Sequence, residues 1–513
     1  MKLTLLKTIL ISSLLYLGVF TVHAQYDIQQ LDQYFEQAHK DWNIPGMAIG
    51  IVKDGKVVLA KGYGVLENGK YDNVDGNSIF AIASNTKAFI GTALGILVEE
   101  GKLKWDDPVQ KYLPYFRLYD DYASQQATVR DLLCHRLGLG TFSGDVIWYK
   151  SNYSAEETVK RAAEVPQDYG FRAGYGYSNL MFITAGEVIK AVSGQSWDAF
   201  IKDRIFDPIG MDRTRTSVSD LETMENVAQP HKPSGKENNA IPYANWDNMG
   251  AAGGILSSAE DMLKWIQLNI DGGTYEGTQV FKESTQSELW KPHNNHKVSK
   301  GSKKLYPSRN FNGYGLGWGL SDYGGQMVAA HGGGYDGMYS RVTVVPGANL
   351  GIVVLTNSMK GISTYLSYKA IDHFLEMEAK DWSKIGLEGQ ARGEKRRQST
   401  LEGRYKSRLS DTQPSLALKD FTGLYTCKMY GDIEIKLEGD QLLVDFKRAP
   451  NLNAKLSHWH LNTFEIQWNE VHAWFDFGTL QFVLDNNGKA QELQFDVPNG
   501  DIFFEEIQAK KVN

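Results

Sequence analysis

Residues 82–103 read IASNTKAFIGTALGILVEEGKL and combine a Ser-x-x-Lys motif with a long apolar run. The run predicts a helix from Asn85 to about Glu100 that is apolar on nearly every side and is therefore buried. Ser84 and Lys87 are three residues apart, so they share one face of this helix. Because burial disfavours the charged form of a lysine, we expect a lowered pKa for Lys87, whose amine can then take the proton of the Ser84 hydroxyl.

By itself the motif is a weak indication, since a chain of this length holds on the order of one or two by chance. The alternative interpretation is a serine that caps the helix beside an exposed lysine. Two features favour a catalytic serine. The dipole of a helix N-terminus stabilises negative charge near Ser84, and the Ser84 backbone N–H can donate to an oxyanion.

A second element, GYGYSNLMFITAGEVIKAVSG at residues 174–194, places Tyr177 and Asn179 before an amphipathic helix over 179–193. A buried tyrosine beside a lysine can relay a proton to a leaving group, and an asparagine amide can hold a substrate carbonyl. Two other Tyr-x-Asn sequences start at Tyr71 and Tyr243. Tyr71 lies in a turn ahead of Ser84, whereas Tyr243 is a rival for the relay.

The third element is HGGGYDG at residues 331–337. A lipase-type oxyanion loop accompanies a Gly-x-Ser-x-Gly elbow, which the chain lacks. A phosphate-binding loop leads into a helix, whereas these glycines lead toward a β-rich run. Both interpretations are therefore weakened. The segment is left as part of some other active-site wall that enters an edge strand at Met338, with glycines that let a substrate backbone lie close.

The three elements resemble, in order and approximate spacing, the S-x-x-K, Y-x-N and K-T-G motifs of the class C β-lactamases and penicillin-recognising serine hydrolases. Three flanking segments also resemble the family, namely LLCHRLGL at 132–139, FDPIGM at 206–211 and GGILSS at 253–258. The resemblance covers roughly residues 27–365. It implies an α+β fold, in which an antiparallel sheet packs on a helical cluster, and it selects Tyr177 over Tyr243.

The resemblance also assigns roles to the residues. Ser84 forms an acyl-enzyme while Lys87 and Tyr177 share its proton. Asn179 orients the amide on the acyl side of the substrate. The Gly-rich segment, including Gly333, lines the site, and the backbone N–H of Gly334 joins that of Ser84 in an oxyanion hole.

His331 stands where the family has lysine, and this is the main departure. It implies a hydrogen bond, or a positive charge when protonated, toward Tyr177 or a substrate carboxylate. His-x-Gly occurs in the esterase and D-amino-acid peptidase or amidase relatives, so the departure favours these over a dedicated β-lactamase. A non-catalytic receptor for cell-wall peptides is a further alternative. A second departure is Arg172-Ala173-Gly174, where relatives usually have Pro-Gly. This difference affects the rigidity of the loop more than the chemistry. No cofactor or metal is implied.

The rest of the chain indicates how the domains are arranged. The hairpin pattern at 46–65 and the two strands at 339–357 predict one antiparallel sheet built from both ends of the first domain, with helices near 128–138, 155–164 and 258–271 between them. Boundaries are predicted at 25–375 for this domain, 376–415 for a charged linker or surface helix, and 416–513 for an all-β, lipocalin-like barrel. The barrel either caps the site or serves stability or dimerisation.

Residues 1–24 have two lysines and then an apolar run, which is typical of a cleaved secretory signal and predicts a periplasmic or secreted protein. Removing them leaves 52 basic and 61 acidic side chains from the 54 and 61 of the whole chain, a net charge of −9. A surface with this net negative charge does not attract nucleic acid, so a small molecule or peptide is the expected partner. Cys134 and Cys427 are expected as free thiols. His458 and His460 are expected at the surface of a strand and not as metal ligands.

Overall fold

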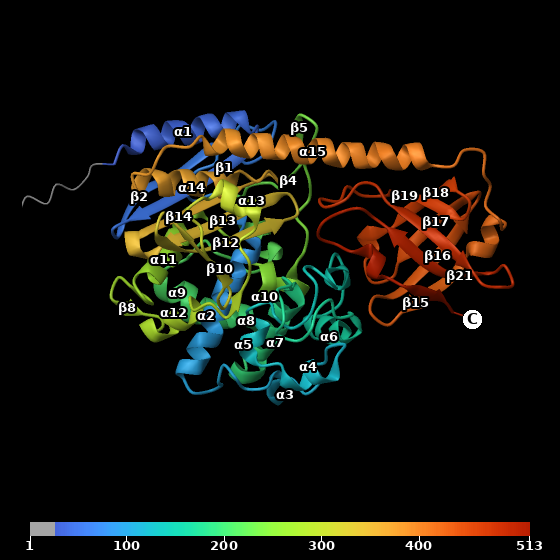
Figure 1. Cartoon of the computed structure of the whole chain (residues 1–513), viewed down its shortest axis with the longest axis horizontal. Coiled ribbons are helices and arrows are strands. Elements are labelled where there is room, and N and C mark those ends of the chain that lie inside the picture. The colour runs from blue at the N-terminus through green and yellow to red at the C-terminus, as the bar shows by residue number, and fades with distance from the viewer. Residues whose placement is uncertain (1–25, 513) are drawn as a thin grey trace, which may run out of the picture.

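The computed structural model describes residues 26–512, so the predicted signal at 1–24 lies outside the described residues. Figure 1 shows a larger body of sheet and helices and a smaller β-barrel, with one long helix running across both. The long helix is α15, Trp382–Ser407. The charged segment predicted as a linker or a surface helix is thus a helix, and most of its side chains are exposed.

The larger body is organised by an eight-stranded antiparallel sheet in the order β2-β1-β14-β13-β12-β11-β10-β9. The predicted meeting of the two ends of the domain is confirmed, because β1 pairs with β14 and Met47 lies opposite Thr356. The strands are β1 Gly46–Lys53, β2 Lys56–Gly64, β9 Asn294–Asn295, β10 Asn312–Tyr314, β11 Gly319–Tyr323, β12 Gln326–Tyr335, β13 Met338–Val345 and β14 Leu350–Thr356. Three small ribbons pair β3 Phe80–Ala81 with β6 Leu256–Ser257, β4 His231–Ser234 with β5 Glu237–Ala240, and β7 Thr274–Tyr275 with β8 Thr278–Gln279.

Helices cover both faces of this sheet. One face packs against α1, α14 and the start of α15, and the other against α11 and the helical cluster around α2 and α7. The helices are α1 Ile28–Asp41, α2 Thr86–Glu99, α3 Val109–Tyr112, α4 Asp121–Gln126, α5 Val129–Leu132, α6 Ala155–Arg161, α7 Asn179–Ser193, α8 Trp197–Ile201, α9 Asp207–Ile209, α10 Gly250–Gly253, α11 Ala259–Ile270, α12 Glu283–Leu289, α13 Lys300–Leu305 and α14 Ile362–Phe374.

Most of the predicted helices are present, and one is mostly absent. Residues 128–138 form only the single turn α5, Val129–Leu132. His135 and Gly138 then take left-handed backbone angles, with φ of 57° and 101°, which a helix cannot contain. The apolar residues that suggested a helix are buried by a loop instead.

The Gly-rich segment also differs from its prediction. Residues 331–335 lie inside strand β12, and the strand that begins at Met338 is an interior strand between β12 and β14, not an edge. However, β11 pairs only with residues 326–330 of β12. Residues 331–335 therefore have a paired side toward β13 and a free side within an otherwise continuous sheet, which leaves room for a substrate.

The C-terminal body is a closed antiparallel barrel of eight strands, which confirms the predicted barrel fold and leaves its likeness to lipocalins a prediction. Apolar and polar positions alternate along the strands, so one face of each fills the interior. The strands are β15 Gly423–Cys427, β16 Gly431–Glu438, β17 Gln441–Phe446, β18 Ala454–His460, β19 Thr463–Trp468, β20 Thr479–Leu484, β21 Ala490–Asp496 and β22 Ala509–Lys511.

Specific polar contacts hold the barrel against the larger body. The carboxylate of Glu506 accepts hydrogen bonds from the Ser143 hydroxyl and, at 2.7 Å, from the Gly144 backbone N–H. The Tyr153 hydroxyl donates to the Tyr430 carbonyl at 2.8 Å, and the Lys232 amine pairs with the carboxylate of Asp476 at 2.5 Å. The barrel is thus docked in a fixed orientation over one side of the larger body.

Three smaller observations complete the description. Cys134 is buried and Cys427 is half-buried, and both are free thiols. His458 and His460 are partly exposed, and residues 26–512 contain no group of three or more His, Cys, Asp or Glu side chains that could hold a metal ion. No helix within that range combines the length and the apolar character that a membrane crossing requires.

Candidate active site

The Ser-x-x-Lys motif lies where a tight turn enters α2. Ala83, Ser84 and Asn85 form one turn of 3-10 helix, and Ala83 has a left-handed φ of 47°. The turn is fixed on both sides, because Ile82 N–H donates to the Ile255 carbonyl at 3.0 Å and the Asn85 amide donates to the Ser340 hydroxyl at 2.8 Å. This arrangement holds Ser84 at the floor of a cleft.

Lys87 is completely buried and points at Ser84. Its amine donates to Ser84 Oγ at 3.1 Å, to Asn179 Oδ1 at 2.7 Å and to the Ala252 carbonyl at 2.7 Å. Burial lowers the pKa of Lys87 to about 7, against a smaller opposing effect of the Asp145 carboxylate. A neutral amine keeps two N–H groups for Asn179 and Ala252, so its lone pair faces Ser84 and can accept the hydroxyl proton.

Asp145 belongs to this group and was missed from the sequence. Its Oδ2 accepts from Asn179 Nδ2 at 2.6 Å, and its Oδ1 accepts from Trp148 Nε1 at 2.9 Å. Burial raises the pKa of Asp145, although both hydrogen bonds and Lys87 oppose the rise. The signal was present as a lone acid beside the apolar run Val146-Ile147-Trp148.

Asn179 therefore connects Lys87 to Asp145. Its amide oxygen holds the lysine and its amide nitrogen holds the carboxylate, so the side chain is fixed between them. Its predicted contact with the amide of a substrate stays a prediction. The described contacts show Asn179 as a group that positions Lys87.

Tyr177 lines the same cleft as Ser84. The Lys87 amine lies 4.9 Å from the centre of its ring. Burial raises the pKa of the Tyr177 hydroxyl, and a hydrogen bond with Ser84 works against the rise. The rival Tyr243 instead donates to the Ala228 carbonyl at 2.7 Å and is absent from the residues that line the cleft.

His331 is neutral and faces a different tyrosine from the one predicted. Its Nδ1 lies 2.6 Å from the Gly332 carbonyl, which only accepts, so Nδ1 carries the proton. Its Nε2 then accepts from the Tyr314 hydroxyl at 2.7 Å. Burial and the nearby Lys87 lower the pKa of His331 to about 3. Burial therefore disfavours a positive charge on His331 near neutral pH, and its Nε2 bonds to Tyr314 and not to Tyr177. The predicted contact with a substrate carboxylate stays a prediction.

The Gly-rich strand packs directly on the turn that carries Ser84. A Cβ on Gly333 would lie 2.1 Å from the Ile82 carbonyl oxygen and 2.3 Å from Ser340 Oγ, so only glycine fits there. Gly334 lies on the same strand opposite Tyr339. The free side of β12 thus runs past Ser84, in the place from which backbone groups could contact a substrate.

A cleft of about 620 Å³ opens over Ser84. Its walls come from both bodies, since Trp474, Asp501 and Ile502 of the barrel line it together with residues of the larger body. Of the two predicted roles for the barrel, the first has a structural basis, because the barrel forms part of the active-site wall.

The profile of the family described as Beta-lactamase matches residues 31–370. The chain belongs to the β-lactamase family. A second profile, described as a domain of unknown function (DUF3471), matches residues 407–511, the range of the barrel.

Similar proteins and solved structures are consistent with this assignment. The unguisins hydrolase ungD of Aspergillus violaceofuscus is 26% identical over 449 residues, which cover 80% of this chain and 78% of that protein. The octameric penicillin-binding protein homologue from Pyrococcus abyssi has the same fold with a TM-score of 0.63 at 21% identity, over 94% of this chain and 99% of that one. The D-amino acid amidase from Ochrobactrum anthropi, solved with L-phenylalanine, has a TM-score of 0.55 at 23% identity, over 68% and 98%.

As a member of the β-lactamase family the protein is a serine hydrolase. The structure brings together Ser84, Lys87, Tyr177, Asn179 and the segment from His331 to Gly334, all of which line the cleft except the wholly buried Lys87. Lys87 reaches the cleft through its bond to Ser84.

Proposed function

We propose that this serine hydrolase cleaves an amide or ester bond through an acyl-enzyme on Ser84, as a D-amino-acid-type peptidase or amidase or as a carboxylesterase. The observation that carries the proposal is the buried Lys87 amine, which lies 3.1 Å from Ser84 Oγ and has a pKa lowered to about 7. A lysine in this state is a general base at neutral pH.

In the acylation step, Ser84 Oγ bonds to the substrate carbonyl carbon and its proton passes to Lys87. The proton then reaches the departing nitrogen or oxygen through the Tyr177 hydroxyl as the C–N or C–O bond breaks. Backbone N–H groups of Ser84 and Gly334 stabilise the oxyanion. Water next attacks the acyl carbonyl, gives a proton to the same pair and releases Ser84, so one water is consumed for each acid and each amine or alcohol formed.

The neutral His331 supports this choice of substrate over a β-lactam. A lysine at that position offers a charge to a substrate carboxylate, whereas His331 is uncharged and already bonded at both nitrogens. The likeness to an unguisins hydrolase supports hydrolysis as the reaction. A class C-like β-lactamase is the second candidate, since the family match covers such enzymes. A receptor without catalysis would have no need of a lowered lysine pKa beside Ser84.

We also propose that the protein acts outside the cytoplasm, in the periplasm or after secretion, on small molecules or peptides that include fragments of cell wall. The support is the apolar N-terminal pattern of residues 1–24. Detection of mature protein beginning near Gln25 in a periplasmic or culture fraction would test it, and an unprocessed cytoplasmic protein would contradict it.

The central experiment is labelling with a fluorophosphonate, followed by mass mapping of the adduct. The label is expected on Ser84 and is expected to be lost in Ser84→Ala. Kinetics with p-nitrophenyl esters, D-amino-acid amides, D-alanyl peptides and nitrocefin then rank the substrate classes. The absence of an adduct on Ser84 would contradict the acyl-enzyme mechanism. A preference for nitrocefin would favour the second candidate, a class C-like β-lactamase.

A further inference from the structure

The cleft over Ser84 does not end at the Gly-rich strand but continues past its free edge. Beyond Gly332 the lining residues include Arg341 of β13, Tyr368 of α14 and Arg309. Side chains alternate across a strand, and Ser340 bonds toward the Ser84 turn, so its neighbour Arg341 points to the opposite face of the sheet. The cleft therefore turns around β12 and reaches the face that packs on α14.

The passage at this turn is open. Gly332 is exposed and pairs with Arg341 across β12 and β13. A Cβ on Gly332 would meet no atom closer than 3.9 Å. Its neighbour Gly333, by contrast, is pressed against the Ser84 turn. A substrate that lies along the free edge can therefore extend past Gly332 without a steric barrier.

Two arginines at the far end lack an acidic partner. Among residues 26–512 no carboxylate lies within 4.0 Å of the guanidinium of Arg309 or Arg341. Arg309 is only 8% exposed and donates to the Tyr368 and Ser302 hydroxyls. The Nε atoms of both arginines are buried without a hydrogen-bond partner. The Arg309 guanidinium also stacks on the Tyr306 ring, 4.1 Å from its centre, and Arg341 is half-buried. Neither contact supplies a negative charge, so two guanidiniums without a carboxylate in one cleft indicate a place for an anion.

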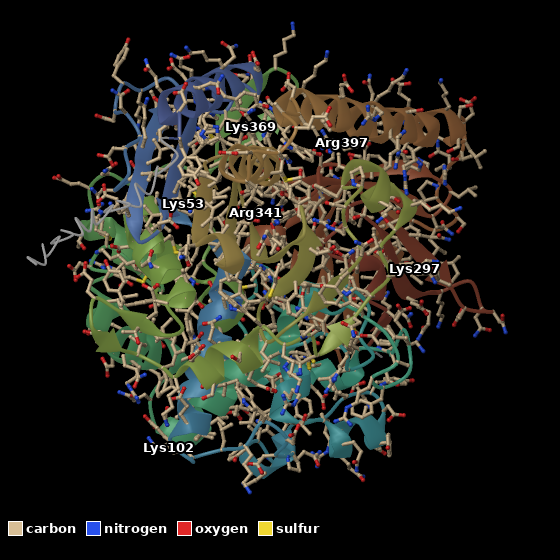
Figure 2. All side chains as sticks on the ribbon, turned by 60° about the vertical axis from the view of Figure 1, so that its left-hand side comes forward. Lys53, Lys102, Lys297, Arg341, Lys369 and Arg397 are labelled. Carbon is tan, nitrogen blue, oxygen red and sulfur yellow. The ribbon has the colours of Figure 1, made fainter. Side chains whose placement is uncertain are left out.

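The nearest candidate for an internal counter-ion is Asp501 of the barrel, which lines the same cleft. Burial alone raises the pKa of Asp501 to about 6, and no arginine acts against the rise. Asp501 is therefore not the partner of Arg309 or Arg341. Figure 2 places Arg341 well inside the outline of the molecule, below the long helix that carries Arg397.

We propose that Arg341 and Arg309 bind a carboxylate at the far end of the substrate's leaving group. The direction of the leaving group follows from the course of strand β12, and this proposal rests on the proposed function. Gly334 is the predicted oxyanion donor, and Gly332 lies two residues along the strand, roughly 7 Å away, toward His331. Tyr177, which delivers the proton to the leaving group, lies on this same side, with its ring centre 6.0 Å from that of His331.

The ligand class is thus an amide or ester with an extended, acid-terminated leaving group. The group must be long enough to pass from the Ser84 face of the sheet, over the edge at Gly332, to the other face. A guanidinium offers a planar pair of N–H donors that matches a carboxylate in bidentate geometry. A short leaving group ends before the arginines and gains nothing from them.

The test compares two N-acetyl-D-alanyl esters that differ in one group. The leaving alcohol is a long-chain ω-hydroxy acid in one ester and the corresponding ω-hydroxy carboxamide in the other. The acid is expected to have a kcat/KM about tenfold to a hundredfold higher, as charge-assisted hydrogen bonds would give. In Arg341→Gln the ratio is expected to fall toward one, and Arg341→Lys, which keeps the charge but not the fork, is expected to retain part of it.

Lys369→Gln is the matched control. Lys369 lies on α14 but stacks on Tyr34 and does not line the cleft, so its loss removes one positive charge from the same face. The ratio is expected to stay at the value of the unmodified protein. If Arg341→Gln does not fold, Arg341→Lys and Arg309→Lys carry the same comparison.

The two hypotheses fail in different ways. A ratio near one in the unmodified protein, or an unchanged ratio in the Arg341 variants, contradicts the carboxylate site while Ser84 still takes the fluorophosphonate. Absence of that label contradicts the proposed function instead. The ω-hydroxy acid and its carboxamide are also compared as competitors of the labelling, where equal protection by both would count against the arginines.

Discussion

Replacing Gly333 with alanine is expected to damage catalysis through a single steric contact. The added Cβ would lie 2.1 Å from the Ile82 carbonyl oxygen, where real contacts of this kind are no shorter than 3.0 Å. Strand β12 and the Ser84 turn must therefore separate by the difference, roughly 0.9 Å. Ile82 precedes the nucleophile by two residues, so the movement is passed directly to Ser84.

A displacement of about 1 Å between reacting groups costs on the order of a hundredfold in rate. We therefore expect kcat/KM of Gly333→Ala on a small neutral p-nitrophenyl ester to fall by about a hundredfold, equivalent to about 2.7 kcal/mol of activation free energy. Overpacking of this kind also lowers the free energy of unfolding by about 1–3 kcal/mol. Thermal unfolding separates the two effects, because a folded protein with lost activity shows the displacement itself.

Gly332→Ala is the matched control, since the same methyl group at the neighbouring position meets no atom within 3.9 Å. Its activity on the small ester is expected to stay within about threefold of the unmodified protein, because a loss of that size is under 1 kcal/mol of activation free energy. Equal activity of Gly333→Ala and Gly332→Ala would refute the reasoning, because the Gly-rich strand would then not be packed on the nucleophile turn.

Three further predictions concern the proton relay. With the pKa of Lys87 lowered to about 7, kcat/KM is expected to rise with pH up to about 7 and then to level, since only the neutral amine accepts the Ser84 proton. A pH–rate profile without this rising limb would exclude Lys87 as the base. In Asp145→Asn the limb is expected to move to lower pH, because the carboxylate raises the pKa of Lys87, and an unmoved limb would show that the two groups are not coupled. Tyr177→Phe is expected to lose about a hundredfold or more in kcat. Tyr243→Phe is expected to lose less than threefold in kcat, and about 1 kcal/mol of stability because its hydrogen bond to Ala228 is removed. The reverse order of the two losses in kcat would assign the proton relay to Tyr243.

The sequence predicted the nucleophile and its base because Ser84 and Lys87 are close together along the chain. Ser84 and Lys87 are related by one helical turn, so their proximity follows from local geometry, and the apolar residues around them already required burial. The lowered pKa of Lys87 follows from that burial. The pairing of β1 with β14 was similarly visible, because alternating apolar strands at the two ends of a domain need partners.

Other features depend on contacts between distant residues. Asp145 meets Asn179 across 34 positions, and a lone acid in an apolar segment does not reveal its partner. His331 was expected to offer a hydrogen bond, or a positive charge when protonated, toward Tyr177 or a substrate carboxylate. In the structure its Nε2 accepts from Tyr314 instead of Tyr177, and burial lowers its pKa. The Gly-rich segment was expected at an edge, and its position inside the sheet depends on how β11 and β13 align.

By itself the sequence determined the family and predicted the nucleophile and its base, because these follow from local spacing, hydrophobic pattern and the order of motifs. Only the tertiary structure decided the charge state of His331, the place of Trp474 in the wall, and the reach of the cleft to Arg309 and Arg341. The physical reason is that desolvation and the shape of a cavity are set by all the groups packed around a point. Those groups come from strands, helices and a barrel that lie hundreds of residues apart.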